Sequence, residues 1–202
     1  MINVENNVLS KDLFNTFITE IEDKNFPWYF SKDVRETNST FSTKNIKSNF
    51  TFESTYQFVH TFILNSKYNS SYITELNNQL ILEIFKKFNI SKGSVQRSKI
   101  NLTLNNNSDS NTFNIPHVDY EVSNKNLKRK TILLYLNESD GDTIFFNEKY
   151  EDSFDEFTLQ KRIKPIKNSA VIFDTNNYHT GQNPIKYKKR LVLNLNFELM
   201  DK

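Results

Sequence analysis

The chain has 202 residues, with 26 basic and 24 acidic side chains and a net charge of +2, a length that suits a single domain. Its three glycines, Gly93, Gly141 and Gly181, lie too far apart to form a dinucleotide fingerprint, a phosphate-binding P-loop or a nucleophile elbow. The chain has no cysteine, which excludes disulfides, thiolate metal sites and a cysteine nucleophile. Any metal would therefore bind to His, Asp or Glu.

Apolar residues recur at helical spacing in the first half of the chain, where we expect a mainly helical segment over residues 1–93. The first predicted helix begins at Ser10, which we expect to cap it, with Leu9 and Phe14 packed together as a hydrophobic staple. The third is expected to run toward Gly93 as its stop signal. The predicted helices cover residues 10–21, 52–63 and 73–84.

From Val95 onward, apolar and polar residues alternate in short runs, which predicts strands separated by loops. The predicted strands cover residues 95–104, 115–121, 129–137, 143–147, 157–164, 169–174 and 189–199. A series of strands of this kind is typical of a β-sandwich or jelly roll. We therefore predict a mostly β, α+β fold in one domain over 1–202, in which the helical segment supports a β core over 94–200.

The apolar runs are far shorter than the ~20 residues that a membrane helix needs, and the first residues carry no basic region followed by an apolar stretch. We therefore expect a cytoplasmic protein that has no membrane partner. Short basic runs occur at 125–130 and 186–190. Because the total charge is balanced, they give no reason to expect a nucleic-acid partner.

Three histidines are present, and two of them have informative neighbours. His60 lies in the second predicted helix, where we expect a structural or surface residue. His117 and Asp119 are two residues apart, so on a strand both side chains point to the same face. His179 follows the apolar run 169–174. Two imidazoles and one carboxylate form the facial set that binds Fe(II) and leaves other coordination positions open.

An arginine and a tyrosine on predicted strands could bind an anion beside these histidines. Arg190 follows His179 by 11 residues and begins the run 189–199, in which leucines occupy one face and polar residues, including Asn194, the other. The leucine face can pack under the helices, and the polar face can line a cavity. The planar guanidinium of arginine binds a carboxylate through two hydrogen bonds. Tyr135 could donate its hydroxyl to the same carboxylate.

Five motifs in the second half of the chain have a familiar order and spacing. They read HVD (117–119), LLYLN (133–137), DGDTIFF (140–146), YHTGQNP (178–184) and KKRLVLNLNF (188–197). In this respect the segment 95–199 resembles the Fe(II)/2-oxoglutarate-dependent oxygenase superfamily, in its prolyl 4-hydroxylase-like branch. The resemblance implies a double-stranded β-helix, a distorted, cupin-like jelly roll.

The resemblance also implies roles for individual residues. His117, Asp119 and His179 would bind the iron, and Arg190 would hold the distal carboxylate of 2-oxoglutarate with help from Tyr135. Further residues would line the pocket: Thr131, Leu133 and Asn194, with Lys99 and Asn101 as weaker candidates.

The implied activity is hydroxylation of a small molecule or of a prolyl or other residue in a peptide, coupled to decarboxylation of 2-oxoglutarate to succinate. It would need Fe(II), 2-oxoglutarate and O2, and ascorbate is a candidate reductant. Related halogenases have a small residue in place of the metal-binding carboxylate, so Asp119 favours hydroxylation.

Two other readings of the same residues remain open. The first is a non-catalytic jelly-roll binding module with a degenerate metal or carbohydrate site. The second is a zinc hydrolase or cupin-type isomerase that uses the same two histidines and Asp119. Arg190 and Tyr135 argue against the second reading, because such an enzyme does not need to hold a carboxylate beside the metal.

Overall fold

The computed structural model describes residues 2–33, 47–119, 128–150 and 153–200. Two helices occur in these residues, α1 (Lys11–Ile21) and α2 (Thr74–Lys87), and neither is long and apolar enough to cross a membrane. The strands are β1 (Asn3–Asn6), β2 (Tyr29–Ser31), β3 (Thr51–Glu53), β4 (Gln57–Leu64), β5 (Lys67–Tyr68), β6 (Gly93–Leu104), β7 (Thr112–Asn114), β8 (Arg129–Tyr135), β9 (Thr143–Lys149), β10 (Leu159–Ile163), β11 (Ser169–Asp174), β12 (Asn177–Gly181) and β13 (Lys189–Leu199).

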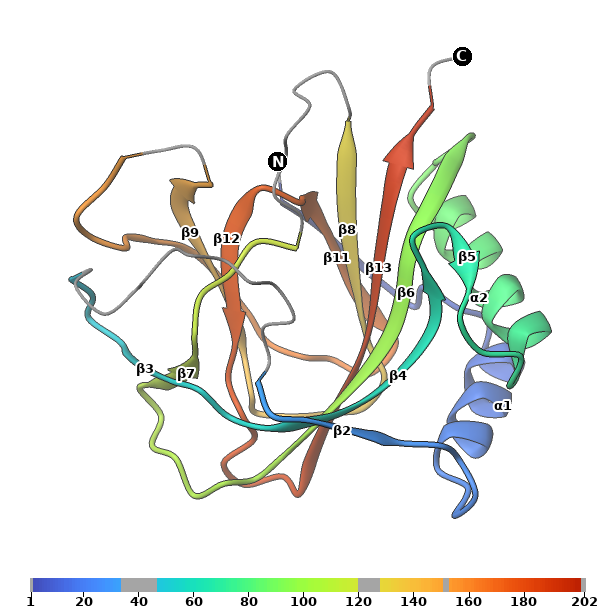
Figure 1. The fold of residues 1–202 in the computed structure, drawn as a ribbon, viewed down its shortest axis with the longest axis horizontal. Coiled ribbons are helices and arrows are strands. Elements are labelled where there is room, and N and C mark those ends of the chain that lie inside the picture. Colours follow the sequence, from blue (N-terminus) through green and yellow to red (C-terminus); the bar gives the residue numbers. More distant parts are fainter. Residues whose placement is uncertain (1, 34–46, 120–127, 151–152, 201–202) are drawn as a thin grey trace.

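Two antiparallel sheets form most of the structure (Figure 1). The larger sheet has the strand order β1-β11-β8-β13-β6-β4-β2, with β5 paired to β4, and the smaller has the order β10-β9-β12. A separate parallel pair, β3 and β7, lies beside the smaller sheet. Two facing sheets with flanking helices form the jelly roll that the strand pattern predicts, so the predicted fold class is confirmed.

β13 lies inside the larger sheet and has different surroundings on its two faces. Leu191, Leu193 and Leu195 belong to the main hydrophobic cluster, which includes buried residues of both helices. The alternate residues face the smaller sheet, where Arg190 donates a hydrogen bond to Thr143 of β9. The predicted alternation is thus confirmed: one face packs under the helices and the other is available for a site.

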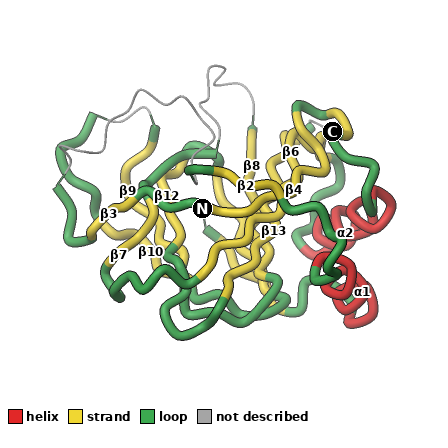
Figure 2. The backbone as a smooth tube through the Cα atoms, turned by 60° about the horizontal axis from the view of Figure 1, so that its bottom comes forward, coloured by secondary structure: helices red, strands yellow, loops and turns green. Residues whose placement is uncertain are grey.

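α1 and α2 lie against each other on the outer side of the larger sheet (Figure 2). α1 starts and ends where the sequence predicts, and Leu9 and Phe14 are both buried. The expected side-chain cap is absent, because the Ser10 hydroxyl donates to Glu83 of α2 at 2.9 Å instead. This contact ties the start of α1 to its neighbouring helix.

The helix predicted over 52–63 is wrong, because this segment forms β3 and β4. β4 lies between β2 and β6, and residues of both alternations are buried, among them Val59 and Phe62. Tyr56, counted in the apparent helical stripe, is 46% exposed. A strand that is buried on both faces no longer alternates between apolar and polar residues, so its apolar residues can fall at helical spacing by chance.

His60 therefore lies on a strand rather than on a helix, and of the two expected positions, structural or surface, the buried structural one is observed. Its side chain is buried, and its Nδ1 lies 2.8 Å from the Pro27 carbonyl oxygen. The ring packs against the rings of Phe26 and Phe62, at centroid distances of 4.8 and 4.7 Å.

The expectation that residues 1–93 are mainly helical is also wrong, because this segment contributes β1 to β5 besides the two helices. α2 ends at Lys87, and Gly93 begins β6 rather than ending the helix. A side chain at Gly93 would place its Cβ 2.8 Å from the Phe85 ring. The glycine is therefore explained by the close packing of β6 against α2.

Most strands predicted in the second half are present, within a few residues at their ends. The exception is the strand predicted over 115–121. β7 stops at Asn114, and residues 115–119 form no regular strand. Residues 120–121 lie outside the described part of the chain. β12, which carries His179, was not predicted as a strand. Of the basic run 125–130, residues 125–127 also lie outside the described part of the chain.

Candidate metal centre and anion pocket

His117 and His179 are brought together by the backbone. The His117 N–H donates to the His179 carbonyl and the His179 N–H donates to the His117 carbonyl, each at 3.0 Å. This bridge joins the irregular segment after β7 to β12. The Asp119 N–H in turn donates to the Thr175 carbonyl at 3.2 Å. The chain therefore positions all three predicted ligands by main-chain contacts, although His117 and Asp119 do not lie on a strand.

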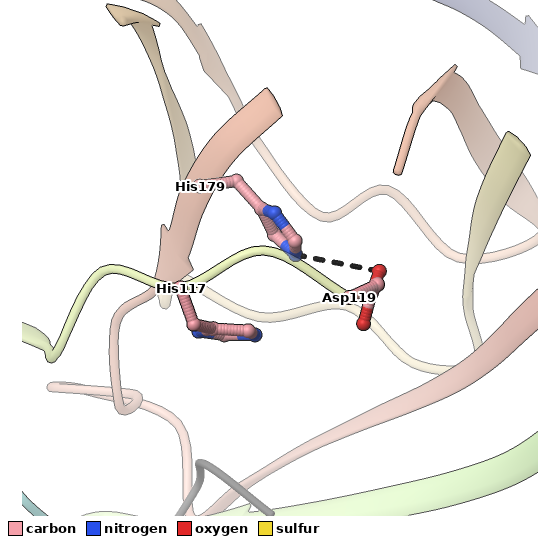
Figure 3. Close-up of side chains that lie close together, drawn as sticks. All are labelled: His117, Asp119 and His179. Atoms are coloured by element: carbon pink, nitrogen blue, oxygen red, sulfur yellow. Dashed lines mark ion pairs between the residues drawn. The ribbon is translucent and has the colours of Figure 1, made fainter. Parts of the chain in front are cut away.

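The three side chains converge (Figure 3). One ligand atom from each of His117, Asp119 and His179 lies within 4.8 Å of the others, and His179 Nε2 is 3.7 Å from Asp119 Oδ2. Two ligands at right angles on a first-row metal ion, each about 2.1 Å from it, are about 3 Å apart. Side-chain shifts of about 1 Å would therefore close the set around one ion. Within the described residues, no other group of His, Asp and Glu meets this criterion.

The protonation of both histidines suits metal binding. The Nδ1 atoms of His117 and His179 lie 3.3 and 3.1 Å from the carbonyl oxygens of Ile115 and Asn177, which accept hydrogen bonds from them in the Nδ1–H tautomer. Each Nε2 lone pair then remains for a metal. Burial lowers the pKa of His117 to about 3 and also lowers the pKa of His179. Both rings are thus neutral at pH 7.

Asp119 receives hydrogen bonds from three adjacent strands of the larger sheet. Its Oδ1 accepts from Arg97 of β6 at 2.7 Å and from Asn194 of β13 at 3.0 Å, and its Oδ2 accepts from Thr131 of β8 at 2.8 Å. Burial acts to raise the pKa of Asp119, but the neighbouring His179 and Arg97 outweigh it and hold that pKa well below its usual range. The carboxylate is therefore ionised and able to bind a cation.

Arg190 lies on the same face of β13 and is 8% exposed. Its Nε donates to the Gly141 carbonyl and its Nη2 to the Thr143 hydroxyl, both at 2.8 Å. Gly181 leaves the space that the guanidinium occupies, because a Cβ there would lie 3.2 Å from Nη1. Burial lowers the pKa of Arg190, but an arginine keeps its charge at neutral pH. It is therefore a fixed buried cation.

One pocket connects the three converging side chains with Arg190, and both sheets contribute to its wall. It is lined by Gln57, Arg97, Lys99, Asn101, Thr103, Asn114, His117, Val118, Asp119, Leu133, Thr143, His179, Gly181, Arg190, Val192 and Asn194. Most of these side chains are polar, and the apolar ones are Leu133, Val118 and Val192. Such a pocket suits a small molecule with an anionic end.

The structure places the predicted pocket residues in two groups. Leu133, Asn194, Lys99 and Asn101 line the pocket together with the predicted ligands and Arg190. Thr131 and Tyr135 stand behind its wall: Thr131 donates to Asp119, and the buried Tyr135 hydroxyl donates to the Thr143 hydroxyl oxygen at 2.9 Å. Tyr135 thus contacts Arg190's hydrogen-bond partner.

Several residues of the site were missed in the sequence. Arg97 lies two residues before Lys99, on the same side of β6, so strand alternation could have indicated it. Thr143 belongs to the motif at 140–146, and its position at the start of a strand was a usable signal. Gln57 and Asn114 had no comparable signal, because they reach the pocket only through tertiary packing.

The sequence and fold both match known proteins. Residues 102–198 match the family model described as "2OG-Fe(II) oxygenase superfamily". The search of curated proteins gave no match.

Three similar solved structures show the extent of the fold similarity. A 2OG-Fe(II) oxygenase family oxidoreductase from Burkholderia pseudomallei has a TM-score of 0.64 and 9% identity, over 99% of this chain and 86% of that one. A prolyl hydroxylase from Trichoplax adhaerens, in complex with a hypoxia inducible factor peptide fragment, has a TM-score of 0.59 and 13% identity, over 98% and 83%. A prolyl-4-hydroxylase from Pseudomonas putida has a TM-score of 0.56 and 16% identity, over 98% and 92%. At these identities the likeness concerns the fold.

Proposed function

We propose that this chain is an Fe(II)- and 2-oxoglutarate-dependent dioxygenase, because residues 102–198 match the family model of the 2OG-Fe(II) oxygenase superfamily. It hydroxylates a small-molecule or peptide substrate and couples this reaction to decarboxylation of 2-oxoglutarate to succinate. The observation that carries the proposal is the convergence of two neutral imidazoles and one ionised carboxylate in a pocket that also contains a buried arginine.

In this proposal His117, Asp119 and His179 hold the iron. The donor set fits Fe(II), which is bound by two histidines and one carboxylate in enzymes that must keep open positions for other ligands. When bound, the iron together with 2-oxoglutarate and O2 supplies the oxidising chemistry. The protein keeps both imidazoles deprotonated and keeps Asp119 ionised, so no proton has to be displaced at pH 7.

Arg190 and Thr143 bind the distal carboxylate of 2-oxoglutarate in this proposal. The guanidinium is already oriented by Gly141 and Thr143, so little side-chain entropy is lost on binding. Val192, the next residue on the same face of β13, provides an apolar wall for the methylene carbons. Asn194 follows on that face and contacts Asp119. The order along the strand matches a molecule with an anionic end and a metal-chelating end.

The substrate is proposed to enter beside β4 and β6. Gln57, Lys99 and Asn101 line this part of the pocket, away from Arg190's contacts with the smaller sheet. The polar side chains in this part of the lining favour a polar substrate over a purely apolar one. This chemistry is compatible with both a peptide and a small polar molecule.

Succinate formation from 2-oxoglutarate in the presence of Fe(II) and O2 tests the proposed activity. We expect turnover by the natural chain and none by Asp119→Ala. Under anaerobic conditions, adding Fe(II) and 2-oxoglutarate should give visible absorption with the natural chain, whereas Asp119→Ala should give none. Absence of both signals across a broad substrate panel contradicts the proposal. Products that are one oxygen atom heavier, identified by mass spectrometry in a treated cell extract, would identify the substrate.

The two other readings make different predictions. A binding module would keep its ligand after Asp119→Ala, because no metal chemistry is needed. A zinc hydrolase or cupin-type isomerase would turn over without 2-oxoglutarate and would tolerate Arg190→Ala. We expect instead that Arg190→Ala sharply raises the concentration of 2-oxoglutarate needed for turnover.

A further inference from the structure

The hydrogen bonds around Asp119 leave one of its oxygens fully occupied and the other only half occupied. Each carboxylate oxygen has about two lone-pair sites. Oδ1 accepts from Arg97 at 2.7 Å and from Asn194 at 3.0 Å, so both of its sites are taken. Oδ2 accepts only from Thr131 among the described residues. Its remaining lone pair lies on the side of His179, whose Nε2 is 3.7 Å away.

The donors are themselves held in place by the larger sheet. Asn196 of β13 is directly opposite both Arg97 of β6 and Thr131 of β8 in the strand register. Asn196 donates to the Thr131 hydroxyl oxygen at 2.8 Å, so the Thr131 proton is free to point at Asp119. Arg97 is 9% exposed and Asp119 is 4% exposed. The arrangement is therefore a buried, charged network in which hydrogen-bond geometry is tightly defined.

We propose that Arg97 is a positioning residue that restricts Asp119 to metal binding through Oδ2 alone. The inference rests on the proposed function, because it concerns the same metal site. A six-coordinate ion with three protein ligands keeps three open positions. If Asp119 bound through both oxygens, one of these positions would be lost, and a chelating cosubstrate would fill the remaining two. Arg97 would thereby preserve a position for O2 on a bound ion.

The guanidinium has a second effect, because it repels a cation bound at Oδ2. Arg97 is thus expected to weaken metal binding while it keeps the coordination position open. A purely structural role for Arg97 predicts the opposite change in metal affinity when the residue is replaced. Loss of a residue that only supports the fold would disorder Asp119 and weaken the binding of any metal. Loss of Arg97 as proposed here would strengthen it.

The test uses the full chain with Mn²⁺ alone, and it requires no turnover. Binding is measured by electron paramagnetic resonance of free Mn²⁺, and the number of bound waters by water-proton relaxation. We expect the natural chain to bind Mn²⁺ with three waters. Arg97→Met should bind it about tenfold more tightly or better, with one water fewer. Arg97→Lys keeps the charge and one donor, and should stay within about threefold of the natural chain.

A matched control is available on β8. Arg129→Met removes a guanidinium that pairs with Glu198 at 3.5 Å, in a pair that does not line the pocket, and should leave Mn²⁺ affinity and water count unchanged. Thermal unfolding of the metal-free variants identifies any that fail to fold. Weaker Mn²⁺ binding by a folded Arg97→Met, or an unchanged water count, overturns the inference alone. If the natural chain and Asp119→Ala both fail to bind Mn²⁺, the inference and the proposed function are overturned together.

Discussion

Arg190 of β13 donates a 2.8 Å hydrogen bond to the Thr143 hydroxyl of β9, and this contact joins the two sheets at the pocket. The same hydroxyl oxygen accepts a second hydrogen bond from Tyr135. With both acceptor sites occupied, the Thr143 proton is left to point elsewhere, and Thr143 lines the pocket. Thr143 is therefore suited to donate to the anion that Arg190 attracts.

We expect Thr143→Val to raise KM for 2-oxoglutarate about tenfold or more and to change kcat less. A hydrogen bond to a charged group contributes about 1.5–3 kcal/mol, and the lost interaction concerns cosubstrate binding rather than the reaction itself. Thr143→Ser keeps the hydroxyl and should remain near the natural chain. Steady-state succinate formation at varied 2-oxoglutarate measures both constants. Arg162→Ala removes an arginine outside the pocket, and an equal rise in KM there would contradict the assignment.

Gly181→Ala should raise KM for 2-oxoglutarate several-fold without large loss of stability. The new Cβ would lie 3.2 Å from Arg190 Nη1, so the guanidinium would have to shift by a few tenths of an ångström. Small misplacements of a binding group are costly in a preorganised site. Gly93→Ala is the matched control: its Cβ would meet the Phe85 ring, which should lower stability and leave KM unchanged. The reverse pattern, with KM altered only by Gly93→Ala, would refute this explanation.

Phe173→Leu should weaken metal binding by several-fold. The Phe173 ring packs edge-on against the His179 ring, with ring centroids 4.7 Å apart. The Phe145 ring stacks on the same imidazole, with ring centroids 5.8 Å apart. A smaller side chain leaves room for the imidazole to rotate, and it also lowers stability by about 1–2 kcal/mol through incomplete packing. Mn²⁺ titration and urea unfolding separate the two effects. A loss of stability with unchanged Mn²⁺ affinity would mean that the ring does not orient His179.

The natural chain should lose stability in mild acid partly through His60. Burial lowers the pKa of His60 below 6.5, so the neutral form is favoured in the folded state. The stabilisation is present above about pH 6.5 and is lost as pH falls toward the lower folded pKa, by at most about 1.4 kcal/mol per pH unit.

Urea unfolding of the natural chain and of His60→Phe at about pH 7.5 and pH 5 isolates this contribution. His117 and His179 are present in both proteins, so their effects cancel. Between these two pH values, the free energy of unfolding should fall less for His60→Phe than for the natural chain. An equal loss in both proteins would show that His60 is protonated without cost.

The sequence predicts β13 and the roles of its two faces, because the alternation of leucines with other residues lies within one short segment. Along β13, leucines face the helices and the alternate residues face the pocket, as the alternation indicates. The failure at 52–63 has an equally physical cause. β4 is covered on both faces, and its pairing with β2 and β6 is a long-range choice that no short window contains.

The candidate site was predictable to the extent that its residues lie in short motifs. His117, Asp119, His179 and Arg190 were all identified from spacing, and the structure brings them to one pocket. Strand alternation could place Arg97 on the pocket side of β6, but its contact with Asp119 was not predictable, because it joins β6 to an irregular segment. The roles of Thr131 and Tyr135 depend on hydrogen bonds behind the pocket wall, which strand alternation cannot distinguish from contacts inside the pocket.

The reciprocal main-chain hydrogen bonds between His117 and His179 join the two segments that carry the imidazoles. Because main-chain contacts hold together the segments that carry these two histidines, we expect chelators to remove a bound metal ion without denaturing the protein. A spectroscopically active substitute such as Co²⁺ could then be loaded into the stripped protein, making each later step of cosubstrate binding visible by colour.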